Sequence, residues 1–268
     1  MAPPPDPRQN HLLAALPLDE YQRLAPLLQP VELKLGDSLA ESGETMCYGY
    51  FPTDSIVSLR CEMEDGNRTE VAVVGAEGVI GVSLFMGGDT TPIRAIVRNA
   101  GSTYRLKAAL LKSEFDRAGP LQDLLLRYTQ SLLAQISQIS VCNRHHSLDQ
   151  QLCRWLLLSL DRIPTDELIM THELIANLIG VRRESITISA GRLQKAGLIS
   201  CSRGRINFLD RPGLEEMCCE CYEAITEEYQ RLMSYRRPPR DKGYRWRDCS
   251  TRDISQHGMI EPGYSTRA

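Results

Sequence analysis

The spacing of the hydrophobic residues changes once along the chain, and this change limits the folds open to it. From Val31 to Leu106, short runs alternate between apolar and polar residues and are broken by glycines. Such period-two alternation with regular turns predicts an antiparallel β sandwich or barrel. After Pro120 the apolar residues recur every three or four positions, which predicts helices. The sequence therefore predicts an α+β chain in which a β domain precedes a helical region.

The composition is that of a globular protein without a generally basic surface. Hydrophobic residues make up 42% of the 268 residues and charged residues 24%, and the formal net charge is -3, so a nucleic-acid surface would have to be local. No apolar run approaches the roughly 18 residues needed to span a bilayer. The proline-rich start "MAPPPDPRQN" lacks the order of a signal peptide. We therefore expect a cytoplasmic protein with no membrane partner, whose nine cysteines remain mostly thiols.

The stretch between Pro120 and Arg144 carries an apolar stripe whose members are separated by alternating steps of four and three residues. Such a stripe, held over three heptads, favours the seam of a coiled-coil dimer. The alternative is that the stripe packs on the chain's own β domain. Leu124, Leu133 and Ile136 form a second apolar face suited to that packing, so we favour the dimer. The predicted seam consists of Leu121, Leu125, Tyr128, Leu132, Gln135, Ile139 and Cys142.

The region from Met170 to Leu209 has the order helix, turn, helix and β hairpin. "THELIANLIG" predicts the first helix and ends on a glycine that permits the turn, and the second helix is expected over about 182–195. "GLISCSRGRINFLD" predicts two short strands joined by a turn. This order is typical of a winged helix-turn-helix. The residues expected to face its core are Leu174, Ile175, Leu178, Ile186, Ala190 and Leu193.

The same spacing leaves the first turn of the second helix facing outward, where a recognition helix meets base edges in the major groove. Arginine suits a guanine and glutamate a cytosine amine, whereas short hydroxyls and wing arginines suit phosphates. An ordinary solvated helix end is the alternative, but a glycine-turned helix pair with a basic wing favours DNA. We expect base contacts from Arg182, Arg183, Glu184 and Thr187. We expect phosphate contacts from Thr171, Ser185, Arg203 and Arg205.

At these residues the chain resembles the Crp/Fnr family of bacterial transcription regulators. The resemblance covers about residues 17–235 and is most specific in "THELIANLIGVRRESITISAGRLQKAGLI". Arg183 and Glu184 match the family's base-reading pair, whereas Ile188 and Ser189 stand where the family has a further DNA-contacting arginine. The resemblance implies a cyclic-nucleotide-binding-like β roll, a long dimerisation helix and a winged helix-turn-helix. It also implies a sequence-specific DNA-binding regulator rather than an enzyme, with a near-palindromic duplex, a second copy of the chain and RNA polymerase as partners.

The expected sensor domain departs from the cyclic-AMP-binding members of the family. Gly78 and Gly81 match, but Val82 replaces the ribose-binding glutamate, and Thr91 falls near the phosphate-binding Arg-Ser pair, with Arg94 two or three residues away. A cyclic phosphate would lack a fixed cation there. The cysteine group of the iron-sulfur members has no counterpart before Cys47. We therefore expect neither cyclic AMP nor an iron-sulfur cluster, and no other cofactor. A pocket for an unknown effector is expected at Gly78, Gly81, Val82, Thr91 and Arg94.

The sequence "CCEC", with Cys218, Cys219 and Cys221, falls in a predicted C-terminal helix, where cysteines act as small apolar side chains. His145 and His146 are adjacent and so point in different directions on a helix, and we expect no metal site.

Two rival functions stay open: a signalling module whose winged helix binds protein, and, less favoured, a metal-dependent enzyme. The predicted domains are a flexible leader at 1–16, the β-roll sensor at 17–118, the dimerisation helix at 119–146, the DNA-binding domain at 147–214, a C-terminal helix at 215–235 and a disordered tail at 236–268.

Overall fold

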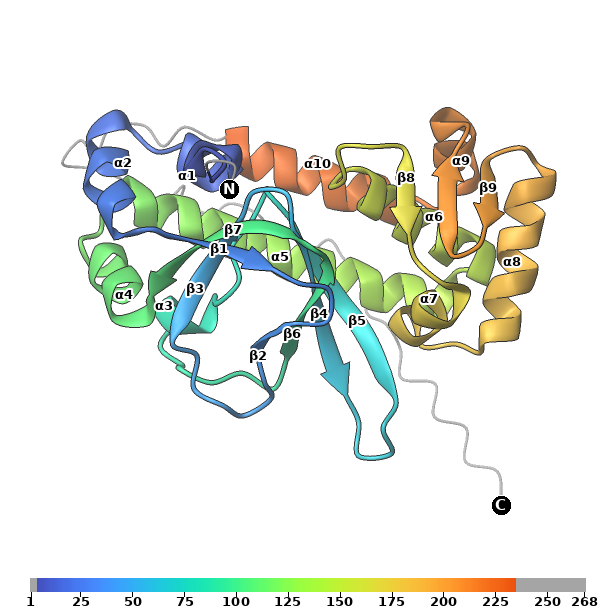
Figure 1. Ribbon diagram of the computed structural model, residues 1–268, viewed down its shortest axis with the longest axis horizontal. Coiled ribbons are helices and arrows are strands. Elements are labelled where there is room, and N and C mark those ends of the chain that lie inside the picture. Colours follow the sequence, from blue (N-terminus) through green and yellow to red (C-terminus); the bar gives the residue numbers. More distant parts are fainter. Residues whose placement is uncertain (1–3, 235–268) are drawn as a thin grey trace, which may run out of the picture. The chain divides into compact units, whose positions relative to one another are not determined.

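The predicted α+β class and the order of its parts are confirmed by the computed structural model, which describes residues 4–234 (Figure 1). The predicted tail at 236–268 lies outside the described residues. Within residues 4–234, no helix has both the length and the apolar character required to cross a membrane. The elements are η1 (Pro7–Gln9), α1 (His11–Ala14), α2 (Leu18–Leu24), η2 (Ala25–Leu27), β1 (Gln29–Leu33), β2 (Ser38–Ala40), β3 (Tyr48–Pro52), β4 (Ile56–Glu62), β5 (Arg68–Val74), α3 (Ser83–Met86), β6 (Arg94–Asn99), β7 (Gly101–Lys107), α4 (Ala108–Asp116), α5 (Pro120–His145), α6 (Leu148–Leu160), β8 (Glu167–Ile169), α7 (His172–Ile179), α8 (Arg183–Lys195), β9 (Ile199–Ser202), β10 (Arg205–Phe208), α9 (Arg211–Met217) and α10 (Cys221–Ser234).

Two antiparallel sheets form the β domain. One has the strand order β1-β7-β3 and the other β2-β6-β4-β5, and the hairpin between β4 and β5 turns at "EDGN". The alternating side chains of both sheets meet in a core that includes Phe51 and Leu106, both fully buried. The period-two pattern in the sequence therefore corresponds to a β domain with one continuous apolar interior.

The start of the chain belongs to this core, so the prediction of a flexible leader at 1–16 is wrong for the described residues 4–16. Leu12 and Leu13 of α1 are buried in the β domain. The buried side chain of Asn10 caps α1 and donates its amide to the carbonyl oxygens of Pro52 and Gly78, each at 2.9 Å. These contacts fix the segment because an amide buried without partners would be costly.

The long helix α5 forms as predicted, but its apolar stripe packs inside the chain. The seven predicted seam residues are at most 9% exposed. Gln135 even accepts a hydrogen bond from the backbone of Val73 in β5, at 2.8 Å. Leu133, which we assigned to the inner face, is 57% exposed. The assigned seam is therefore wrong, because a stripe with steps of three and four marks a buried helix face without saying what covers it.

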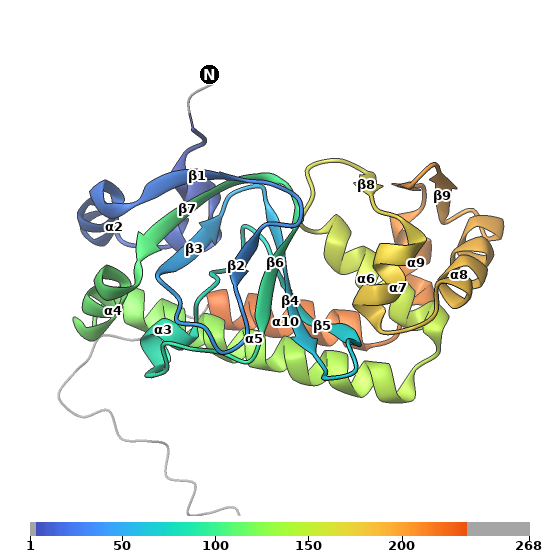
Figure 2. The ribbon, with the colours of Figure 1, turned by 60° about the horizontal axis from the view of Figure 1, so that its bottom comes forward.

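The predicted single helix at 215–235 is two helices. α9 stops at Met217 because Cys218 adopts an extended backbone, and α10 begins at Cys221. α10 then runs back along α5 (Figures 1 and 2), with Cys221 near Gln138 and Glu228 near Gln130. The break thus places the cysteines beside the end of α5.

Candidate nucleic-acid interface

The helix-turn-helix is built by α7 and α8 with a tight turn between them. Gly180 ends α7 in the left-handed region (φ +81°), and its amide donates to the carbonyl oxygen of Ala176 at 2.9 Å. A residue with a β carbon is strained in this conformation, which explains the glycine. Thr171 caps the start of α7, since its hydroxyl accepts a hydrogen bond from the amide of Leu174 at 3.2 Å.

The core face of α8 is the predicted one. Ile186, Ala190 and Leu193 are all at most 3% exposed and pack with α6 and the wing. The prediction for α7 is only partly correct, because Leu174 is 42% exposed while Ile175 and Leu178 are buried. Leu174 lies one position before the buried pair Ile175 and Ala176, so the helix turns it out of the core.

The wing has one more strand than the sequence indicates. β8 joins the two predicted strands to give an antiparallel sheet with the order β8-β10-β9. Its three residues, Glu167–Ile169, are too few for a period-two signal, which explains the omission. The turn between β9 and β10 forms the tip of this wing. There Arg203 (φ +47°) and Gly204 (φ +78°) are both left-handed, as a two-residue hairpin turn of type I′ requires.

The four predicted base-reading side chains share one exposed surface at the start of α8. Arg182, Arg183, Glu184 and Thr187 are all exposed. The side chain of Arg183 is 65% exposed and its Nε lies 4.0 Å from a carboxylate oxygen of Glu173, which is too exposed to hold it firmly. Among residues 4–234, no carboxylate forms an ion pair with Arg182. Both guanidinium groups are therefore free to meet an external acceptor.

The four predicted phosphate-binding side chains differ in their exposure and in their hydrogen bonds and ion pairs within the chain. Arg203 is exposed, and no carboxylate in the described part of the chain pairs with it. Arg205 forms an exposed ion pair with Glu167. Ser185 is half-buried, and Thr171 already accepts the capping hydrogen bond. Arg203 at the tip of the wing is thus the most available cation of this set.

Two further side chains near this surface, His172 and Arg192, add little net charge to it. Burial lowers the pKa of His172, and the nearby Arg183 guanidinium lowers it further, so the imidazole is neutral at pH 7. Its Nδ1 lies 3.2 Å from the hydroxyl of Thr187. Arg192, lower on α8, pairs with Asp149 of α6 at 3.0 Å, and Ser189 donates to the same carboxylate at 2.6 Å. Arg192 is therefore less available to an external acceptor than the arginines at the start of α8.

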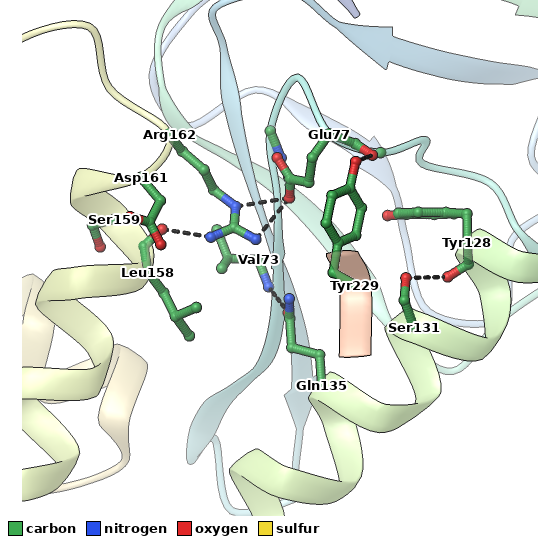
Figure 3. A network of polar contacts seen from close by, with 12 residues as sticks. Val73, Glu77, Tyr128, Ser131, Gln135, Leu158, Ser159, Asp161, Arg162 and Tyr229 are labelled. Atoms are coloured by element: carbon green, nitrogen blue, oxygen red, sulfur yellow. Dashed lines mark hydrogen bonds and ion pairs between the residues drawn. The ribbon is translucent and has the colours of Figure 1, made fainter. Parts of the chain in front are cut away.

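A cavity of about 970 Å³ lies beside α5, lined by residues of α1, β5, α6, α9 and α10 as well. Figure 3 shows its polar wall: the Arg162 guanidinium donates to the Glu77 carboxylate at 2.7 Å and to the Leu158 carbonyl oxygen at 2.6 Å. Tyr229 of α10 donates its hydroxyl to the Glu77 carbonyl oxygen at 3.0 Å (Figure 3). These residues carry no signal in the sequence, because they meet only in the folded chain.

None of the five predicted effector residues lines this cavity. The Arg94 guanidinium is held by Glu41 at 2.7 Å and by Glu62 at 2.6 Å, so its charge is already compensated. Gly78 lies against Tyr128, and a β carbon there would come within 2.3 Å of the Tyr128 hydroxyl oxygen. The glycine therefore serves close packing between the β domain and α5.

Comparison with known proteins supports the helix-turn-helix and the fold. Residues 150–217 match the family described as the Crp-like helix-turn-helix domain. The chain is 25% identical over 196 residues to the transcriptional regulator SdrP of Thermus thermophilus, covering 70% of this chain and 94% of SdrP. A solved structure described as a regulator of the Crp/Fnr family from Eubacterium rectale is 19% identical, with a TM-score of 0.63, over 78% of this chain and 98% of that one. The structure of FixK2 from Bradyrhizobium japonicum is 16% identical, with a TM-score of 0.61, over 72% of this chain and 98% of that one.

Proposed function

We propose that this chain, a Crp/Fnr-type transcription regulator whose residues 150–217 form a Crp-like helix-turn-helix domain, binds a near-palindromic DNA duplex as a homodimer. The observation that carries the proposal is the free, exposed surface at the start of α8, where Arg182 and Arg183 project from a helix anchored by buried Ile186. Its activity is regulation rather than catalysis. In this proposal its place of action is the cytoplasm, and RNA polymerase is a further partner.

The exposed side chains divide into two roles in this proposal. Arg183 makes a bidentate contact with a guanine, and Glu184 accepts from a cytosine amine, while Arg182 and Thr187 contact neighbouring base edges. Arg203 at the wing tip contacts a phosphate, which adds affinity without sequence preference. Thr171, Ser185 and Arg205 contribute to the backbone contacts, Arg205 after release from Glu167.

Replacing Arg183 with alanine is expected to relax specificity at one base pair of each half-site. The loss is about 1–3 kcal/mol per contact on the preferred sequence, and much less on duplexes altered at that base pair. The measurement is a fluorescence-anisotropy titration of the variant against a set of duplexes that differ at single positions.

Arg203→Ala is the matched control, because it removes one exposed arginine from the wing tip instead of the helix. It should weaken binding to all duplexes by a similar factor and reduce the dependence of affinity on salt. An Arg183→Ala variant that loses the same affinity on every duplex would assign Arg183 to the phosphates and contradict its role as a base reader.

The dimer requires a face of α5 other than the predicted seam. Exposed residues on this helix repeat at seven-residue intervals, with Leu126, Leu133 and Ser140 in one series and Gln130 and Ser137 in the other. This spacing is that of a coiled-coil seam, and its apolar members Leu126 and Leu133 are exposed in the described part of the chain, whereas Gln130 borders α10 through Glu228. Leu126 and Leu133 are 46% and 57% exposed, which favours a second copy of the same helix as their partner.

Leu133→Asp is expected to turn the dimer into a monomer, because it places a charge opposite its own symmetry mate in the seam. Sedimentation equilibrium should give the 30.1 kDa mass of one chain for this variant and twice that mass for the native protein. Leu35→Asp, at a site 64% exposed in the loop before β2, is the control and should remain dimeric. A dimeric Leu133→Asp variant would show that the seam lies elsewhere.

A further inference from the structure

Four side chains that are far apart in the sequence converge at the end of α5. Cys142 lies in the last turns of that helix, His146 directly follows it, and Cys219 and Cys221 come from the break between α9 and α10. Their three sulfur atoms and one imidazole nitrogen all lie within 4.8 Å of one another. The three cysteines are at most 6% exposed, and His146 is partly buried. Thiolate and imidazole are the ligands that structural zinc sites use.

The shortest separations match the edges of a tetrahedral site. The Cys142 and Cys219 sulfur atoms are 3.5 Å apart, and Cys221 Sγ lies 3.4 Å from Nδ1 of His146. In a zinc tetrahedron with Zn–S of about 2.3 Å and Zn–N of about 2.0 Å, neighbouring ligand atoms are about 3.5–3.8 Å apart. The widest pair, at up to 4.8 Å, needs to close by about 1 Å, which small χ1 rotations shared between two ligands, within their rotamer wells, would provide.

The second nitrogen of His146 has the partner expected of a metal ligand. Its Nε2 lies 3.3 Å from a carboxylate oxygen of Glu220, the residue between the two cysteines of the break. A proton held on Nε2 by this carboxylate leaves the Nδ1 lone pair directed at the sulfur atoms. In zinc sites, the nitrogen of a ligating histidine that does not bind the metal usually donates its hydrogen to a carboxylate or a backbone carbonyl in this way.

A buried cation beside the cluster calls for negative charge within it. Arg154 of α6 is 3% exposed, and its Nε donates to Cys142 Sγ at 3.2 Å. In the part of the chain that the structure describes, no carboxylate forms an ion pair with this guanidinium. Three thiolates around a divalent ion carry one net negative charge, which Arg154 would balance. Gln138 likewise donates an amide hydrogen to Cys221 Sγ at 3.3 Å, stabilising a second thiolate.

We propose that Cys142, His146, Cys219 and Cys221 bind one Zn²⁺ ion in a closed, structural site. The soft donor set and the tetrahedral arrangement favour zinc over magnesium or calcium, which require oxygen ligands. The ion would join the end of α5 to the start of α10 at the junction with the DNA-binding domain. Cys219 also lines the cavity beside α5, which gives the ion a route inward.

The test uses the full-length chain, purified without chelators, and elemental analysis of metal per chain. The native protein should carry one zinc, and His146→Ala and Cys219→Ser should lose it. His145→Ala and Cys218→Ser are the matched controls, each changing the neighbouring residue of the same type outside the set, and both should retain zinc. Refilling the metal-free native protein with Co²⁺ should produce the intense thiolate-to-cobalt absorption of a tetrahedral site, which keeps the test valid if a variant fails to fold.

Two outcomes would overturn the proposal. One is a native protein with no bound zinc and no cobalt spectrum, whether its mass matches free thiols or is two hydrogens lower through a Cys142–Cys219 disulfide. The other is zinc retained in full by His146→Ala and by Cys219→Ser, since the ion would then lie elsewhere in the chain.

Discussion

Replacing Glu70 with alanine is expected to lower the free energy of unfolding by about 3–5 kcal/mol, the usual cost of removing one partner from a buried ion pair. Glu70 on β5 accepts from Nη1 of Arg98 at 3.2 Å and from the indole of Trp155 at 3.0 Å. All three side chains are at most 6% exposed. The Arg98 guanidinium also lies over the Trp155 ring, 4.7 Å from its centre, and donates to Ser159 at 2.9 Å. Without the carboxylate, a buried cation remains without its counter-ion.

The contact matters for function because it joins the β domain to the DNA-binding domain. Glu70 and Arg98 come from β5 and β6, whereas Trp155 belongs to α6. Urea unfolding followed by circular dichroism is the measurement. Glu62→Ala, on the neighbouring strand β4, is the control: its carboxylate also pairs with arginines, but in solvent, so its midpoint should stay close to that of the native protein. Equal midpoints for the two variants would mean that the buried pair contributes no more than the surface one.

Ile186→Ala is expected to destabilise the DNA-binding domain by about 2–5 kcal/mol and to abolish specific DNA binding under conditions where that domain unfolds. Ile186 is fully buried under α8, in contact with the core that α6, α7 and the wing share. Removing its side chain leaves a cavity that the surrounding residues fill only partly. Thermal unfolding and duplex binding of the same preparation give the two readouts.

Ile188→Ala is the matched control on the same helix. Ile188 lies two residues further along and is 57% exposed, so its truncation should change stability by no more than about 0.5 kcal/mol. The pair measures which face of α8 points outward. A larger loss of stability for Ile188→Ala than for Ile186→Ala would show that the opposite face of α8 is buried. The arginines assigned to DNA would then face the core.

The sequence predicts the winged helix well because its burial follows directly from spacing. Ile186, Ala190 and Leu193 recur at helical intervals and are buried, and the arginines between Gly180 and Ser185 are exposed. The capping box at Ser147 is equally local: its hydroxyl accepts from the amide of Gln150 at 3.4 Å, and the Gln150 side chain accepts in return at 3.1 Å. Features fixed within one or two turns of chain are visible in the sequence.

The errors concern contacts between distant segments. The stripe on α5 was assigned to a partner chain because periodicity identifies a buried face but not what buries it. α10, which covers part of α5, was expected to start six residues earlier and to be continuous with α9. For the same reason the convergence of Cys142 and His146 with Cys219 and Cys221, more than 70 residues further along, was not foreseen, because no spacing along the chain indicates that these side chains meet.

The most direct test of the central claim is selection of duplexes from a random pool by the full-length protein, followed by sequencing of the bound fragments. Two recognition helices in a symmetric dimer should enrich an inverted repeat whose half-site centres are about 10–10.5 base pairs apart. Enrichment of a single unrepeated site, or of no sequence at all, would contradict a homodimer that reads DNA through Arg183 and Glu184 at the start of α8.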